Sequence, residues 1–331
     1  MSATVQMGLL DISNAEHHSL PALSNSGMKD LAISPLRYWY QNINPNRPEA
    51  EETASMRIGS ALHCAVLEPT AFDDRYARAI DPSRFPICLD TIQEIRAWIS
   101  DRGERPKGNR KEEVIAHALD LMNRLGEHAP ILQVEQARAA KENEGKTILA
   151  LDEWERVAGM AQALTEEPAL RSVLANGKGE VSMTARDPET GVLLKARLDW
   201  MAPDVTLDLK TFTVKRDGSV DKSICDAIYY EGYHRQAYFY SFVRSLVTGE
   251  TPKDFLFSFV ESDQPHETRI KRLTSKRGGS LNLYWEMARQ ECRKLIRLYA
   301  DCLAQYGDDP WRDKQEISTL ADEDVRQFSY A

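Results

Sequence analysis

Residues 207–212, which read LDLKTF, place a carboxylate and an ammonium group two positions apart in one short segment. Leu207 and Leu209 alternate with Asp208 and Lys210, and this period of two is typical of a β-strand with one buried face. Asp208 and Lys210 therefore share the other face. Taken alone, the segment fits a solvated face with an ordinary ion pair better than it fits a metal-dependent phosphodiesterase centre.

The segment just before this strand predicts two more strands that carry carboxylates. Turn signals at residues 187–191 (DPETG) and 203–204 divide it into strands. Antiparallel pairing across the second turn would place Asp199 near Asp208, and Glu180 begins the first strand and can reach the same edge. Hydrolysis of a phosphodiester with Mg²⁺ needs carboxylates that converge on a hard cation, and a nearby lysine can offset charge in the transition state.

The rest of the chain predicts helices on either side of these strands. Residues 72–110 show no regular pattern and are expected to be irregular, with a charged loop near their end. This order favours an α/β (α+β) fold, in which helices flank a central mixed sheet and elaborate its N-terminal side. The predicted helices span residues 24–32, 53–69, 111–125, 151–175, 225–248 and 280–305, and the further strands span 253–262 and 267–273.

The length of 331 residues suits one large domain. We expect a single domain over residues 1–331. Its parts would be a mostly helical region (20–175), a catalytic sheet with an inserted helix (176–275), and a C-terminal helix and tail (276–331).

Composition restricts the function classes. A net charge of −9 gives no global basic field, although a nuclease needs only a local basic groove. The five cysteines are scattered without a CxxC pair, which argues against a zinc ribbon or a disulfide framework. The N-terminus lacks the pattern of a signal peptide, and no apolar run reaches membrane-spanning length. We expect a cytoplasmic protein with no membrane partner.

Two helical segments carry further polar candidates. His63 lies within IGSALHCAVLEP (58–69), and read alone it fits a histidine satisfied inside a helix. Gln236 and Tyr240 are one helical turn apart in YYEGYHRQAYFYSFV (229–243), so they share a face. A packed tyrosine beside a surface glutamine would explain that pair equally well.

Taken together, these segments resemble the PD-(D/E)XK nuclease superfamily, and within it the exodeoxyribonuclease VIII (RecE-type) exonucleases. The DxK strand and its upstream aspartate resemble the superfamily core. Residues 58–69 are similar to the family's GTALHxxxLEP helix, and residues 229–243 to its GYHxQxAxY helix and to the Q-x3-Y helix of RecB-like nucleases. Residues 23–40 and 177–201 resemble the family's Ser-Pro opening and its DPxTG hairpin. The resemblance covers roughly residues 20–260.

The resemblance implies a role for each matching residue. The metal, Mg²⁺ with Mn²⁺ as a possible substitute, would be bound by His63, Asp199, Asp208 and the carbonyl of Leu209. Lys210 would be the catalytic lysine, supported by Glu180, Gln236 and Tyr240.

Contacts with DNA are less sharply indicated. The candidates are Arg37, Arg197 and Arg235, with Lys215 and Arg216 near the site in sequence. The basic run at residues 269–277 could be a solvated face or a rim that follows DNA.

The resemblance also implies an activity and partners. It implies a bacterial or phage-encoded 5′→3′ exonuclease that acts on the ends of double-stranded DNA and leaves 3′ overhangs. It further implies a ring-shaped homo-oligomer and a single-strand annealing protein of the RecT/Bet type as a recombination partner. The alternatives are a related endonuclease, a Cas4-like nuclease, for which the cysteines supply no recognisable cluster set, and an inactive DNA-binding relative. A helical protein with coincidental charges would leave the ordered motifs unexplained.

Overall fold

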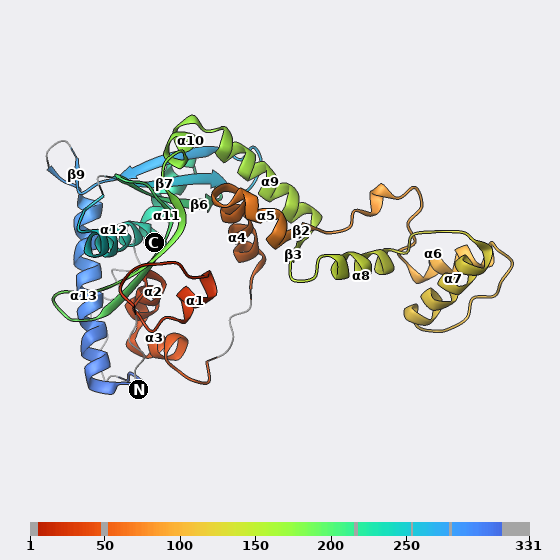
Figure 1. Ribbon diagram of the computed structural model, residues 1–331, viewed down its shortest axis with the longest axis horizontal. Coiled ribbons are helices and arrows are strands. Elements are labelled where there is room, and N and C mark those ends of the chain that lie inside the picture. The colour runs from red at the N-terminus through yellow and green to blue at the C-terminus, as the bar shows by residue number, and fades with distance from the viewer. Residues whose placement is uncertain (1–5, 48–51, 215–217, 253, 278–279, 313–331) are drawn as a thin grey trace.

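A mixed sheet of six strands lies at the centre of the fold, with helices on both of its faces (Figure 1). The computed structural model describes residues 6–47, 52–214, 218–252, 254–277 and 280–312. The sheet order is β1-β4-β5-β6-β7-β8, and all neighbours are antiparallel except β6 and β7. The strands are β1 (Gly8–Leu10), β4 (Lys178–Arg186), β5 (Leu193–Met201), β6 (Val205–Phe212), β7 (Asp254–Glu261) and β8 (Thr268–Leu273). The predicted α/β fold with a central mixed sheet is confirmed.

Helices and short strands complete the described part of the fold. Two small two-stranded ladders are β2 (Tyr76–Arg78) with β3 (Thr147–Leu149), and β9 (Lys276–Arg277) with β10 (Ser280–Leu281). The helices are α1 (Asn14–Ser19), α2 (Asn25–Ile33), α3 (Pro35–Asn42), α4 (Ala54–Leu67), α5 (Pro69–Arg75), α6 (Ile92–Ser100), α7 (Lys111–Leu125), α8 (Leu132–Glu142), α9 (Leu151–Glu166), α10 (Pro168–Leu174), α11 (Val220–Tyr230), α12 (Tyr233–Thr248) and α13 (Leu283–Tyr306). None of the helices in these described ranges is both long and apolar enough to cross a membrane.

Strand β6 is buried on both sides, and its alternation separates an apolar face from the face with the charges. Leu207 and Leu209 pack with α4, α9 and α10 in one core, to which Leu62 and Met160 belong. Phe212, which shares the face of Asp208, packs with α12 in a second core. The two faces of residues 207–212 therefore pack against helices on opposite sides of the sheet.

The hairpin between β4 and β5 is fixed by a buried ion pair. The carboxylate of Asp187 accepts hydrogen bonds from the amide and hydroxyl of Thr190, at 3.0 and 2.6 Å, and Gly191 takes the left-handed conformation that the turn requires. Arg293 of α13 donates to both oxygens of Asp187, at 2.5 and 3.2 Å, and reaches Glu189 at 2.6 Å. The C-terminal helix is thereby tied to the hairpin that carries the site.

We expect Arg293→Ala to destabilise the protein by about 3–5 kcal/mol, because it leaves the fully buried Asp187 carboxylate without its charge partner. Denaturant unfolding of the metal-free protein measures this change. The matched control is Arg297→Ala, which removes a 62% exposed guanidinium 3.0 Å from Glu189 and should cost less than about 0.5 kcal/mol. Equal losses for the two variants would contradict the prediction.

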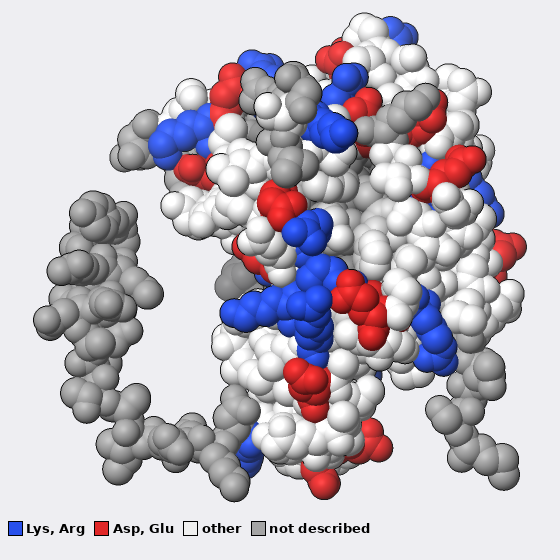
Figure 2. Space-filling model, turned by 90° about the vertical axis from the view of Figure 1, so that its left-hand side faces the viewer, with Lys and Arg blue, Asp and Glu red and all other residues white. Residues whose placement is uncertain are grey.

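The surface that α13 covers carries both signs of charge. Lys and Arg side chains gather near the middle of this face, with Asp and Glu side chains beside them (Figure 2). Besides the pairs of Arg293 and Arg297, Arg289 makes a bidentate contact with Glu286. The basic residues of this face are therefore largely matched by carboxylates.

Residues 79–146 form an insertion, here called the arm, between β2 and β3. It contains α6, α7 and α8, and α6 and α7 lie apart from the sheet at the far right of the molecule (Figure 1). The two helices enclose a core of their own, in which Ile95, Trp98 and Leu121 are buried. The expectation that residues 72–110 are irregular is wrong for α6, which starts with a capping box of Thr91 and Glu94.

Two predicted helices are each divided in the structure. The helix expected over 151–175 breaks before Pro168, because proline cannot donate to the preceding turn and instead begins α10. The helix expected over 225–248 breaks at Gly232, whose φ of +69° separates α11 from α12. Ser34 ends α2 as predicted and also caps α3.

Candidate metal centre

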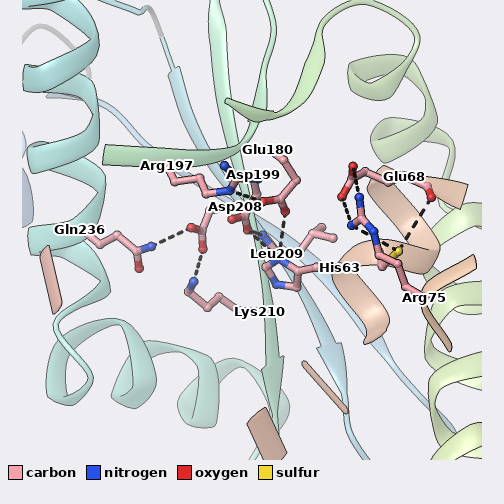
Figure 3. A network of polar contacts seen from close by, with 11 residues as sticks. His63, Glu68, Arg75, Glu180, Arg197, Asp199, Asp208, Leu209, Lys210 and Gln236 are labelled. Atoms are coloured by element: carbon pink, nitrogen blue, oxygen red, sulfur yellow. Dashed lines mark hydrogen bonds and ion pairs between the residues drawn. The ribbon is translucent and has the colours of Figure 1, made fainter. Parts of the chain in front are cut away.

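The centre lies where β5 and β6 separate. The ladder between them contains only two residue pairs, Trp200 with Leu207 and Met201 with Thr206. Beyond Leu207 the edge of β6 that faces β5 has no further paired residues in this ladder, whereas the other edge of β6 pairs with β7 along its whole length. The carboxylate of Asp199 spans the opening and accepts a 2.8 Å hydrogen bond from the amide of Leu209 (Figure 3). The predicted pairing across the second turn is therefore present but short, and the fork it leaves is where polar groups meet.

Three side chains from three elements converge at this fork. His63 of α4, Glu180 of β4 and Asp199 of β5 each offer a ligand atom, and these atoms lie within 4.8 Å of one another. Nδ1 of His63 is 3.5 Å from Oδ2 of Asp199 and 4.0 Å from Oε1 of Glu180. The side chains of His63 and Glu180 are 28% and 21% exposed, so this side of the centre is open to solvent.

Glu180 is held in place by its backbone and by an arginine. Its φ of +54° is unusual for a residue with a side chain, and such local strain is concentrated at functional positions. Its neighbours Gly179 and Val181 pair with Trp200 and Leu198, so Glu180 stands opposite Asp199. Arg197 donates to Oε2 of Glu180 at 2.7 Å. The other carboxylate oxygen is therefore directed toward His63.

Asp208 and Lys210 form a second, deeper part of the centre. Asp208 is fully buried, Oδ1 accepts a 2.8 Å hydrogen bond from Nε2 of Gln236, and Oδ2 contacts Nζ of Lys210 (Figure 3). Gln236 comes from α12, on the opposite side of the sheet from α4. The predicted sharing of one strand face by Asp208 and Lys210, and the approach of Gln236, both occur in the structure.

The crowding of carboxylates changes the ionisation of these groups. Burial, and then the nearby carboxylate of Asp208, raises the pKa of Asp199 above its ordinary value. Burial alone would lower the pKa of Lys210, but the carboxylates of Asp208 and Asp199 outweigh it and raise the pKa. Lys210 is therefore protonated at neutral pH, whereas Asp199 retains a proton more readily than a solvated aspartate does.

The donor set fits a divalent cation. Two ligands of one Mg²⁺, each about 2.1 Å from the ion, lie at most about 4.2 Å apart. The two distances from His63 fall within that limit. Oxygen donors from carboxylates suit Mg²⁺ and Mn²⁺, and an imidazole shifts the preference toward Mn²⁺. His63, Glu180 and Asp199 would hold the ion, and Asp208 lies next to them.

We expect Mn²⁺ to raise the melting temperature more at pH 8.5 than at pH 5. The raised pKa of Asp199 means that the metal-free folded protein binds more protons than the unfolded chain above about pH 4, so its stability falls as pH rises through the raised pKa. A bound cation offsets this loss, by about 2.7 kcal/mol at a hundred times Kd. Thermal scans at both pH values, with Ca²⁺ as a second oxygen-preferring cation, test it. An equal Mn²⁺ effect at both pH values would contradict the prediction.

The remaining predicted residues lie at different distances from the cluster. Arg197 belongs to it through Glu180, and its Nη1 also donates to Ser182 Oγ at 2.6 Å. Tyr240 is partly buried on α12, where burial and then the carboxylate of Asp208 raise its pKa. Arg37 is half-exposed on α3, with Nε 3.5 Å from Asp30. That the carbonyl of Leu209 binds a metal stays a prediction.

The basic candidates for DNA contacts are mostly paired with carboxylates. Nη1 of Arg235 is 3.7 Å from Glu291. In the run 269–277, Arg269, Lys271 and Arg272 approach Glu267, Asp221 and Asp254, as expected of a solvated face. Lys215 and Arg216 lie outside the described residues.

Two residues near the centre, Lys29 and Tyr233, were not predicted from the sequence. Nζ of Lys210 lies 5.0 Å from the centroid of the Tyr233 ring, and Nζ of Lys29 lies 5.8 Å from the same ring. Burial lowers the pKa of Lys29, which belongs to α2. Only the folded chain brings Lys29 to Lys210, so spacing could not identify it. Tyr233 sits in the recognised segment, and its place three residues before Gln236 was an available signal.

A cleft of about 820 Å³ opens next to the cluster. Its lining includes residues 9–15, Glu68, Arg75, Lys178, Glu180 and Arg197. The backbone carbonyl of Ile12 accepts a hydrogen bond from Arg197, which ties residues 9–15 to the centre. The cleft gives a ligand direct access to Glu180.

One family model and two solved structures are similar to this chain. The family model described as a PDDEXK-like domain of unknown function (DUF3799) matches residues 24–308. A crystal structure described as a "Putative exonuclease" from Eubacterium rectale is 15% identical, with a TM-score of 0.49 over 96% of this chain and 98% of that chain. The crystal structure of the protein SSO0001 is 13% identical, with a TM-score of 0.26 over 44% of this chain and 60% of that chain. No curated protein matches the sequence.

The family assignment rests on the match of the family model. The matched segment includes His63, Glu180, Asp199, Asp208 and Lys210, together with the whole six-stranded sheet apart from β1. The chain therefore belongs to the DUF3799 family of PDDEXK-like domains of unknown function.

Proposed function

We propose that this protein is a metal-dependent DNA exonuclease that degrades linear double-stranded DNA. The observation that carries the proposal is the convergence of His63, Glu180 and Asp199 within 4.8 Å, next to the pair of Asp208 and Lys210. A single carboxylate beside a lysine would be an ordinary ion pair. Three candidate metal ligands beside the pair of Asp208 and a protonated Lys210 suit a cation and a phosphate.

The protein residues would act in separate roles. A bound divalent cation supplies charge stabilisation for the phosphoryl group and activation of water. Gln236 orients Asp208 through its 2.8 Å hydrogen bond, and Arg197 orients Glu180. Lys210 stays protonated between carboxylates, so its ammonium group can position the attacking water and offset negative charge that develops on the phosphate.

The cleft beside the cluster suits a DNA strand. Arg75, Lys178 and Arg197 supply cations there. Arg75 and Arg197 pair with Glu68 and Glu180, and Lys178, which is 73% exposed, lies 3.9 Å from Asp11. Phosphates contact such side chains without regard to sequence. A nuclease that degrades DNA from its ends needs this kind of sequence-independent contact.

The proposal also covers the direction of DNA degradation, the oligomeric state and the partner protein. We propose 5′→3′ degradation that leaves 3′ overhangs, a ring-shaped homo-oligomer around the duplex, and a single-strand annealing protein as partner. These features come from the resemblance of the sequence motifs to RecE-type exonucleases. A ring would explain how a chain with a net charge of −9 remains on its substrate.

A digestion assay tests the activity. Linear duplex labelled at its 5′ ends and a covalently closed circle are incubated with Mg²⁺ or Mn²⁺, with Asp208→Ala as the control. We expect release of label from the linear duplex only, and none from the variant. Nicking of the circle would identify an endonuclease, and no cleavage of either substrate with either metal would leave a DNA-binding role.

A further inference from the structure

Four aromatic side chains form a connected group where α11, α12 and the start of α13 meet. This group, here called the tyrosine platform, consists of Tyr229, Tyr230, His234 and Tyr284. The rings of Tyr229 and Tyr230 lie edge to face at 5.2 Å, and Tyr229 stacks on His234 at 5.8 Å with an interplanar angle of 10°. The ring of Tyr284 lies 6.4 Å from that of His234.

The three tyrosines of the platform are exposed, unlike most aromatic side chains of the described residues. Tyr230 is 77% exposed, Tyr229 47% and Tyr284 41%, in a molecule whose other aromatic rings mostly fill its cores. His234, by contrast, is buried, and its Nδ1 lies 2.9 Å from the carbonyl of Ile228. The histidine therefore holds Tyr229 in a fixed orientation. Grouped aromatic rings that remain exposed mark a binding surface, and a preorganised one loses less entropy on binding.

The platform is joined directly to the metal centre. Tyr230 ends α11, and Tyr233 begins α12 after the turn at Gly232. The Tyr233 ring lies under the ammonium groups of Lys210 and Lys29. The platform therefore adjoins Tyr233 along the chain, and Tyr233 is the residue that contacts both Lys210 and Lys29.

Both cations and carboxylates lie near the platform. Burial lowers the pKa of Lys29, which interacts electrostatically with the carboxylates of Glu231 and Asp208 as well as with Lys210 and Arg235. A further carboxylate, that of Glu291, lies 3.6 Å from Nε2 of His234 and 3.7 Å from Arg235. Cations beside flat aromatic faces are the combination that binds single strands.

We propose that the tyrosine platform stacks unpaired nucleobases of a DNA strand next to the metal centre. This rests on the proposed nuclease function, because only a DNA substrate brings bases to this place. Stacking on an aromatic side chain contributes about 1–3 kcal/mol per base and tolerates any sequence, because every base has a flat face.

Binding of a short polypyrimidine single strand containing 2-aminopurine tests the platform. Ca²⁺ replaces Mg²⁺ so that binding is measured without cleavage, by anisotropy and by quenching of the base fluorescence. We expect Tyr230→Ala to weaken binding about 5- to 100-fold, which corresponds to the loss of one stacked base, and to reduce the quenching. Tyr230→Phe should bind like the unchanged protein, as should Tyr40→Ala, which removes a tyrosine 45% exposed on α3. Binding of a fully paired duplex should change little in any variant.

Two results would overturn the proposal. One is unchanged binding and quenching in Tyr230→Ala. The other is a change in the molecular mass of Tyr230→Ala in light scattering, which would identify the platform as a contact between proteins. Failure of the nuclease proposal is a separate outcome: the unchanged protein would then cleave no DNA with Mg²⁺ or Mn²⁺, while the effect of Tyr230→Ala on strand binding would persist.

Discussion

Lys210→Met is expected to lower the rate of DNA hydrolysis at saturating metal by about 10²–10³-fold or more. The ammonium group of Lys210 contacts Asp208, which is fully buried, and is kept protonated by the surrounding carboxylates. Methionine retains much of the length and the apolar stem but removes the charge. The loss should therefore appear in kcat rather than in the binding of DNA, and single-turnover digestion of an end-labelled duplex measures it.

Two further variants separate the role of the ammonium group from a general loss of positive charge. Lys210→Arg keeps the positive charge but changes its shape, and it should recover only part of the rate, since the planar guanidinium cannot take the place of a compact ammonium group. Lys178→Met removes an exposed lysine that lines the cleft and should keep kcat. A Lys210→Met protein that folds, binds metal and digests DNA at the normal rate would exclude Lys210 from the chemistry.

Asp199→Asn is expected to abolish hydrolysis and at the same time to stabilise the metal-free protein at pH 8. The carboxylate of Asp199 has a raised pKa, so its ionisation at that pH opposes folding. Asparagine removes the charge, and its side-chain oxygen can still accept the hydrogen bond from the amide of Leu209. We expect a rate loss of at least about 10²-fold, a higher melting temperature without metal and a smaller shift when Mn²⁺ is added.

The opposite signs of these effects make the prediction specific. A residue that only supports the fold would lose stability and activity together, whereas a ligand kept for function often costs stability. Asp187→Asn is the contrasting variant, because its carboxylate is satisfied by Arg293 and Thr190 and should lose stability at the same pH. Parallel losses of stability in both variants would show that Asp199 is a structural residue.

The strands could be predicted from the sequence because their signals are local. Alternation in residues 207–212 and the DPETG turn define β4, β5 and β6, and the turn fixes the register that places Glu180 opposite Asp199. Counting outward from the centre of the turn, between Glu189 and Thr190, would have placed Glu180 opposite Asp199 and so assigned it to the cluster of ligands, beyond the supporting role inferred from the motif. The roles of His63 and Gln236 came from resemblance to known nucleases, because neither lies near Asp208 in the sequence.

Other features depend on contacts that no local pattern records. The central place of β6 in the sheet depends on its pairing with β7, which follows more than 40 residues later. Lys29 reaches the centre only through the packing of α2 against α12. Helix α6 had a capping box and apolar positions at helical spacing, but the charged residues around it concealed a short helix.

The arm has a consequence for how the molecule responds to heat and to proteases. Its ends are joined by the parallel pairing of β2 with β3, and its buried side chains are separate from those beneath the sheet. A segment that is closed at its base and has an apolar core of its own opens as its own cooperative unit. Amide hydrogen exchange should therefore resolve two levels of protection, with the arm opening while the sheet stays intact. One melting temperature would then describe neither part, and stability measurements on the site variants need a probe within the sheet.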